Sequence, residues 1–139
     1  MKGRRFRLLP HTADLMLEVR GADLPGLFSS CVLALFSLLT DRRTVRGAEF
    51  RTAEAAGGTA EEQLFFLLRE ALQIFTVHRF VARTARVTIH KERVTLTVAG
   101  EPLDFSRHDV RREIKAVTAH AIAVERSPGG CLARFVVDV

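Results

Sequence analysis

TAEEQLFFLLREALQIFT, residues 59–76, is the stretch of sequence that decides the fold. Its apolar residues recur at intervals of three and four, the period of a helix with one apolar face. Thr59 and Glu62 match the capping box, in which each side chain accepts a hydrogen bond from the other residue's backbone N–H. The segment therefore predicts an amphipathic helix that ends near Thr76.

Residues 24–40, upstream, repeat this helical spacing of apolar side chains. Asp23 is a suitable N-cap, and Pro25 falls in the first turn, where its missing N–H costs nothing. The pattern predicts a further amphipathic helix. Cys31 lies on the apolar face of this helix and is interpreted as a small buried hydrophobic residue. With Cys131 it makes two cysteines, too few for a zinc cluster.

The other segments carry the period-two alternation and the turn residues that are typical of strands. The predicted strands are residues 6–9, 15–20, 44–52, 87–89, 94–98, 116–124 and 132–137, with a loop over residues 53–58. Turn signals around Lys91-Glu92 and residues 127–130 indicate two hairpins. We therefore predict an α+β fold of two amphipathic helices packed on a largely antiparallel or mixed β-sheet, in a single domain over residues 1–139.

The composition is that of an ordinary globular protein. Hydrophobic residues make up 47% of the chain and charged residues 27%, a balance that argues against global disorder. No apolar run reaches the roughly 18 residues of a membrane span, and residues 1–9 lack the apolar region of a signal peptide. We therefore expect a cytoplasmic protein that does not enter a membrane.

The net charge of +5 raises the question of nucleic-acid binding. The basic residues are 18 arginines and three lysines, distributed along the chain without a long basic run, and there is no Trp or Tyr to stack on bases. The phenylalanines mostly occupy periodic positions that predict a core. This pattern favours a solvated arginine-rich surface, with direct RNA binding left as an alternative.

Two carboxylates stand near the ends of the chain. Asp14 closes His11-Thr12-Ala13-Asp14 at a strand junction, where it could ligate a hard cation through oxygen. Aspartate also ends loops for local hydrogen-bonding reasons. Asp138 lies in an apolar strand, which disfavours aspartate, so this side chain needs either solvent or a partner. From the residues alone both interpretations stay open.

A polar region lies between the two predicted hairpins. Its candidate site residues are Glu101, Asp104, His108, Glu113, Lys115 and His120. Strand alternation predicts that Glu113 and Lys115 share one face of the sheet, where such a pair is usually a surface ion pair. His120 is interpreted as a hydrogen-bonded core histidine. The chain has no nucleophile elbow, phosphate-binding glycine loop or Cys–His pair, so no catalytic residue is predicted.

Several motifs follow one another along the chain: HTAD at 11–14, Gly21, LFSLLTD at 35–41, the helix at 62–72, GEPLD at 100–104, RH at 107–108, EIKAVTAH at 113–120, and Asp138. Together these segments resemble the archease family. The chain departs from the family pattern at Leu15-Met16, Phe65-Phe66 and Ala119, where Ile-Gly, a tryptophan and a tyrosine are common. These departures are apolar replacements, and they leave the surface that meets a partner undefined.

The resemblance implies a protein that is not itself an enzyme but activates an RtcB-type RNA ligase in tRNA splicing and RNA repair. It implies promotion of GTP-dependent guanylylation of the ligase and of multiple turnover, with GTP used by the ligase and RNA reached through it. It also implies a divalent-cation site for Ca²⁺, Mg²⁺ or Mn²⁺ at Asp14 and Asp138, with a main-chain oxygen of Val139. His11 and the six polar candidates above would support that site or the partner surface.

Two alternatives differ in what they predict. A stand-alone metal-dependent phosphohydrolase would use Asp14, Asp138 and either His11 or His120, and would turn over a phosphate substrate without a ligase. An RNA chaperone would bind RNA with an affinity that falls steeply with salt.

Overall fold

The computed structural model describes residues 6–9 and 14–139. In these ranges the elements are β1 (Phe6–Leu9), β2 (Asp14–Gly21), α1 (Leu24–Leu39), the 3-10 turn η1 (Arg42–Thr44), β3 (Glu49–Ala56), α2 (Ala60–Thr76), β4 (Phe80–His90), β5 (Arg93–Pro102), β6 (Ala116–Ser127) and β7 (Gly130–Asp138). The predicted α+β class is confirmed. None of these elements is a helix long and apolar enough to cross a membrane.

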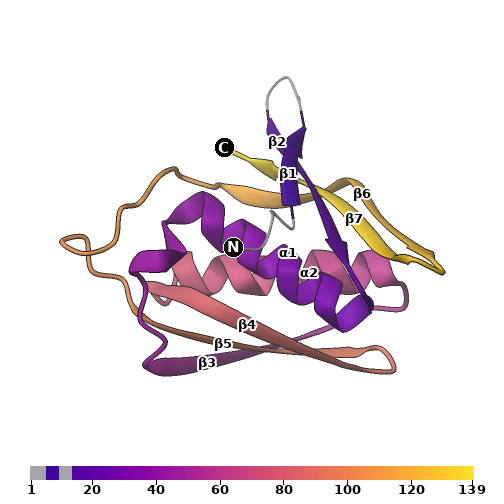
Figure 1. Cartoon of the computed structure of the whole chain (residues 1–139), viewed down its shortest axis with the longest axis horizontal. Helices are drawn as coiled ribbons and strands as arrows, with labels where there is room; N and C mark the ends of the chain where they lie inside the picture. The colour runs from indigo at the N-terminus through magenta and orange to yellow at the C-terminus, as the bar shows by residue number, and fades with distance from the viewer. Residues whose placement is uncertain (1–5, 10–13) are drawn as a thin grey trace.

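The strands form two antiparallel sheets, where we predicted one. The first sheet has the order β1-β2-β7-β6 and the second has the order β3-β5-β4. Every strand pair in the described ranges is antiparallel. Both helices lie between the two sheets (Figure 1) and share one core with them. The outer faces of the sheets are therefore left for polar side chains.

Both helices begin at the residues that the sequence predicts. The Asp23 carboxylate accepts a hydrogen bond from the Gly26 N–H at 2.8 Å and caps α1. The capping box of α2 is complete, since the Glu62 N–H donates to the Thr59 hydroxyl at 3.1 Å and the Thr59 N–H donates to the Glu62 carboxylate at 3.2 Å. Cys31 is fully buried in the core, which confirms its interpretation as a small hydrophobic residue.

The predicted strand at 44–52 and loop at 53–58 are wrong in their bounds. The strand β3 spans Glu49–Ala56 and pairs along its whole length with β5. Small residues such as Ala53 and Ala55 predict a loop, yet in the structure these two alternate inward and pack against the core. A strand that lies over a helix accepts small side chains on its inner face, so composition alone was misleading here.

The predicted strand alternation over residues 113–120 is also wrong. The strand β6 begins only at Ala116, and Ile114 and Val117, three residues apart, are both buried. Further on, residues 119–122 stand opposite the single residue Phe135 in a bulge. This bulge leaves His120 exposed, which contradicts its interpretation as a core histidine.

Candidate functional site

Asp14 and Asp138 stand directly opposite each other in the first sheet. The antiparallel register of β2 and β7 pairs these two residues at one end of the ladder, where β2 begins and β7 ends (Figure 1). Side chains directly opposite in such a ladder have Cβ atoms about 4.5–5.5 Å apart. Leu17 and Phe135 point into the core, so the period-two alternation places both carboxylates on the outer face of the sheet.

The electrostatics of this acidic pair are unfavourable without a counter-charge. The pKa of Asp138 is raised above its ordinary value, first by a hydrogen bond with Asp14, then by burial and by the negative charge of Asp14. Like charges directly opposite each other on a sheet destabilise it. The pair therefore favours either a proton or a bound cation between its oxygens.

Lys115 is the basic neighbour of this pair. Its backbone N–H donates to the Asp138 carbonyl oxygen at 2.8 Å, and its ammonium group acts against the rise in the pKa of Asp138. This single positive charge offsets only one of the two carboxylates. The main-chain bond also ties the start of β6 to the end of β7 beside the pair.

The donor set suits a hard cation. Carboxylate and main-chain oxygens are the ligands of Ca²⁺, Mg²⁺ and Mn²⁺, whereas zinc sites are built mainly from sulfur and nitrogen. Val139 follows Asp138 directly and is 42% exposed. No three His, Cys, Asp or Glu side chains gather in residues 6–9 and 14–139. A cation here would therefore take further ligands from the main chain or water. His11 lies outside the described residues.

Glu101 is the centre of a separate polar network. Its Oε2 accepts a hydrogen bond from the Arg46 backbone N–H at 2.7 Å, and its two oxygens accept bonds from Arg107 at 3.0 and 2.6 Å. Burial opposes its ionisation. The bonds from Arg46 and His108 and the charge of Arg107 outweigh burial, so the pKa of Glu101 lies below its ordinary value.

His108 is buried and fixed as one tautomer. Its Nδ1 accepts a hydrogen bond from the Asp104 backbone N–H at 2.9 Å, so the proton resides on Nε2, which lies 2.9 Å from Glu101 Oε2. The Asp104 carboxylate accepts bonds from the Ser106 N–H and hydroxyl within its own turn. Glu101, Asp104 and His108 therefore anchor the loop after β5 to the rest of the fold.

Glu101→Gln is expected to lower the free energy of unfolding by roughly 2 kcal/mol, because the amide cannot satisfy three donors and leaves Arg107 without its counter-charge. Chemical denaturation measures this loss. Divalent-cation binding should stay at the wild-type level in the folded variant. A cation affinity that falls together with stability would place Glu101 in the cation site instead.

Two of the predicted candidates join neither cluster through a side-chain bond. Glu113 is exposed in the loop before β6. His120 is exposed in the bulge, where its backbone N–H donates to the Thr118 hydroxyl at 3.0 Å. The structure thus brings together Asp14, Lys115, Asp138 and Val139, and separately Glu101, Asp104 and His108.

Glu18 is a buried, ion-paired residue of the first sheet that the sequence did not reveal. It is 3% exposed on the outer face of the first sheet and is held between Arg7 at 2.8 Å and Arg134 at 2.9 Å. These two bonds, that of Arg134 first, lower the pKa of Glu18. Period-two alternation places Glu18 on the same face as Asp14. Its partners lie on β1 and β7, and only the strand pairing shows this.

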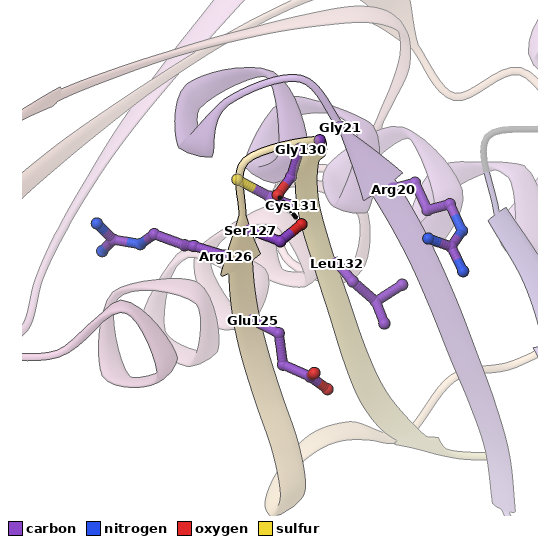
Figure 2. A pocket seen from close by; sticks show the side chains of 9 residues that line it. Arg20, Gly21, Glu125, Arg126, Ser127, Gly130, Cys131 and Leu132 are labelled. Carbon is purple, nitrogen blue, oxygen red and sulfur yellow. Dashed lines mark hydrogen bonds between the residues drawn. The ribbon is translucent and has the colours of Figure 1, made fainter.

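A hollow of about 390 Å³ lies at the opposite end of the β2–β7 ladder from the acidic pair. Figure 2 shows that Arg20 and Arg126 extend to opposite sides of it, while the Ser127 hydroxyl is bonded to the Gly130 carbonyl oxygen. Its polar groups do not converge on a common point. The hollow is therefore a poorer candidate site than the acidic pair.

The fold and the acidic pair define a small α+β protein with a two-carboxylate candidate cation site between neighbouring strands. The family model described as Archease protein family (MTH1598/TM1083) matches residues 6–139. The chain belongs to the archease family.

Relatives of similar length support this assignment. The chain is 33% identical to the protein archease of Thermococcus gammatolerans, covering 98% of this chain and 99% of the relative, and 30% identical to that of Pyrococcus abyssi, with the same coverage. The solution structure of Methanobacterium thermoautotrophicum protein 1598 superposes with a TM-score of 0.83 at 27% identity, covering 99% of this chain and 100% of that one. The crystal structure of a Thermotoga maritima archease, described as a possible chaperone, has a TM-score of 0.66 at 17% identity over 94% of each chain and shows the shared fold.

Proposed function

We propose that this protein activates an RtcB-type RNA ligase in the cytoplasm, by promoting GTP-dependent guanylylation of the ligase and its multiple turnover. In this proposal the protein is an accessory factor and the ligase carries the chemistry. The observation that carries the proposal is the pairing of Asp14 with Asp138 across β2 and β7. These are the two residues at which the family resemblance implies a divalent cation.

The acidic pair would act at the contact with the ligase. Asp14 and Asp138 would hold Ca²⁺, Mg²⁺ or Mn²⁺ through their carboxylate oxygens, with a main-chain oxygen of Val139 beside them. A bound divalent cation supplies concentrated positive charge at the end of the first sheet. Lys115 fixes the Asp138 backbone, and the pairing of β2 with β7 sets the two aspartates opposite each other before a partner arrives. This pre-ordering would help to order the nucleotide-binding residues of the ligase.

Multiple-turnover RNA ligation tests this function. The cognate ligase, with GTP, Mn²⁺ and RNA in large excess, is assayed with and without this protein. We expect continued product formation beyond one equivalent of ligase only when the protein is present. Equal progress curves would reject the activator function. Phosphate release from nucleotides by this protein alone, in the same buffer, would favour a phosphohydrolase instead.

A further inference from the structure

Arginines that are far apart in the sequence gather at one end of the molecule. The segments 41–46, 79–83 and 101–112 contain eight arginines and four carboxylates, a net charge of +4 out of +5 for the whole chain. In Figure 1 they correspond to η1, the start of β4, and the end of β5 with its following loop, which meet at the left-hand end. We call this the arginine surface: Arg42, Arg43, Arg46, Arg79, Arg83, Arg107, Arg111 and Arg112.

Hydrogen bonds join these three segments into one surface. Arg42 donates to the Arg83 carbonyl oxygen at 2.6 Å, and Arg83 donates to the Val45 carbonyl oxygen at 2.9 Å. The loop after β5 is attached by Arg107, which reaches the Thr44 carbonyl oxygen at 3.3 Å. The Leu103 N–H also donates to the Arg79 carbonyl oxygen at 2.7 Å. The guanidinium groups of Arg42, Arg83 and Arg107 are therefore held in fixed relative positions, and Arg79 is tied to this surface by its main chain.

Arg83 is placed by a backbone irregularity. The pairing of β4 with β5 shifts between Ala82 and Thr84, so Arg83 is the extra residue of a β-bulge. Bulges redirect a side chain and are common beside functional sites. Burial, followed by the positive charge of Arg83, lowers the pKa of Arg42. Two like charges are thus held together through carbonyl oxygens, which carry no counter-charge. The negative charge of Asp41 favours the charged form of Arg42, and an anion would relieve the remaining repulsion between Arg42 and Arg83.

Three of the four carboxylates of this region, all except the exposed Asp109, are engaged within the fold. Asp41 lies 2.9 Å from Arg43 and 3.5 Å from Arg111, and its pKa falls to about 2, mainly through the hydrogen bonds from Arg43. Glu101 binds Arg107, and Asp104 closes its own turn. Because eight arginines face four carboxylates, the surface keeps net positive charge for an outside partner. Arg43 remains 87% exposed although it is paired with Asp41.

An exposed aromatic side chain accompanies this charge. Phe105 is 70% exposed in the turn between Asp104 and Arg107. The chain has no Trp or Tyr, but the exposed ring of Phe105 is available for stacking. A basic surface with an exposed ring is the usual arrangement for binding single-stranded nucleic acid, in which phosphates meet cations and bases stack on aromatic faces.

We propose that the arginine surface binds the phosphate backbone of single-stranded RNA, with Phe105 stacking on an unpaired base. RNA fits better than an acidic protein segment, because an acidic peptide offers no base to Phe105, whereas the guanidinium fork matches carboxylate and phosphate alike. The inference goes beyond the proposed function. RNA affinity can be measured without a ligase. A protein that does not bind RNA could therefore still activate the ligase, and a protein that does not activate the ligase could still bind RNA.

Fluorescence anisotropy with a labelled oligouridine of about 12 nucleotides tests this surface at several salt concentrations. The triple variant Arg43→Gln/Arg46→Gln/Arg112→Gln is expected to weaken binding about tenfold or more and to reduce the salt dependence of the affinity, which scales with the number of phosphates contacted. The matched control is Arg86→Gln/Arg93→Gln/Arg126→Gln, with the same change of charge outside this surface. It should weaken binding about twofold at most.

Phe105→Ala separates stacking from charge. Loss of a base-stacking ring should weaken binding of the single strand roughly fivefold or more and leave binding of a duplex RNA unchanged, since duplex bases are not free to stack. Equal weakening by the two triple variants would overturn the proposal, because it would mean diffuse attraction to net charge. Binding of polyglutamate as tight as that of RNA would overturn it in favour of an acidic protein partner.

Discussion

Asp138→Asn is expected to stabilise the cation-free protein against heat and to abolish its stabilisation by divalent cations. The carboxyl of Asp138 has a raised pKa in the folded protein, mainly because of Asp14. The pKa of Asp138 is therefore higher in the folded protein than in the unfolded chain. At pH values between these two pKa values the folded state binds more protons than the unfolded state, so the stability of the fold decreases as the pH rises through this interval. At higher pH the repulsion remains until a cation or the neutral amide removes it.

Thermal unfolding at neutral pH measures both effects. With Ca²⁺, Mg²⁺ or Mn²⁺ at about a hundredfold above its dissociation constant, the wild-type protein should gain roughly 5–10 °C in Tm. Asp138→Asn and Asp14→Asn should start from a higher Tm in chelator and gain almost nothing with the cation. Glu54→Gln, the same change of charge on the second sheet, should respond like the wild type. A full cation response in both aspartate variants would contradict the site.

Gly100→Ala is expected to cause the largest loss of stability among single methyl additions. Gly100 lies in β5, paired with Ala82 of β4 and Glu49 of β3. A Cβ atom built on it would stand 1.8 Å from the Val81 carbonyl oxygen. That oxygen belongs to a backbone held by the ladder beside the Arg83 bulge, so it cannot move aside without breaking strand pairing.

The expected cost is about 4 kcal/mol or more, a large share of the roughly 5–15 kcal/mol that stabilises a typical domain. Urea unfolding should show either a much lower midpoint or a chain that is already unfolded. Gly47→Ala is the matched control, because a Cβ atom there would meet Ala99 and Arg83 at 3.7 and 3.8 Å, ordinary contact distances. Equal midpoints for the two variants would refute the steric argument.

Local signals explain which parts of the fold could be predicted from the sequence. Each helix is marked by a cap and by apolar residues at intervals of three and four, and both signals lie within one segment of sequence. Asp23, Thr59 and Glu62 therefore locate the starts of the two helices. Strand bounds depend on pairing between distant segments. The strand β3 was misplaced because its inward side chains are alanines, and the bulge in β6 was missed because nothing in residues 119–122 marks it.

The candidate site was predictable only through the family resemblance. Neither Asp14 nor Asp138 carries a local signal stronger than that of an ordinary loop or terminal aspartate, and the register that places them opposite each other involves the two ends of the chain. The same holds for Glu18, whose arginine partners lie on other strands, and for the arginine surface. Charges that are scattered in sequence converge only when strands pair and a loop folds back.

The most direct test of the activator account is the stimulation of multiple-turnover RNA ligation by Asp14→Asn/Asp138→Asn, compared with the wild type and with Glu54→Gln. Each protein is first shown to be folded by its cooperative thermal unfolding. The account predicts that the wild type and Glu54→Gln sustain repeated turnover of the cognate ligase, while the double variant leaves it near one turnover. Equal stimulation by all three proteins would contradict a role for the acidic pair in activation.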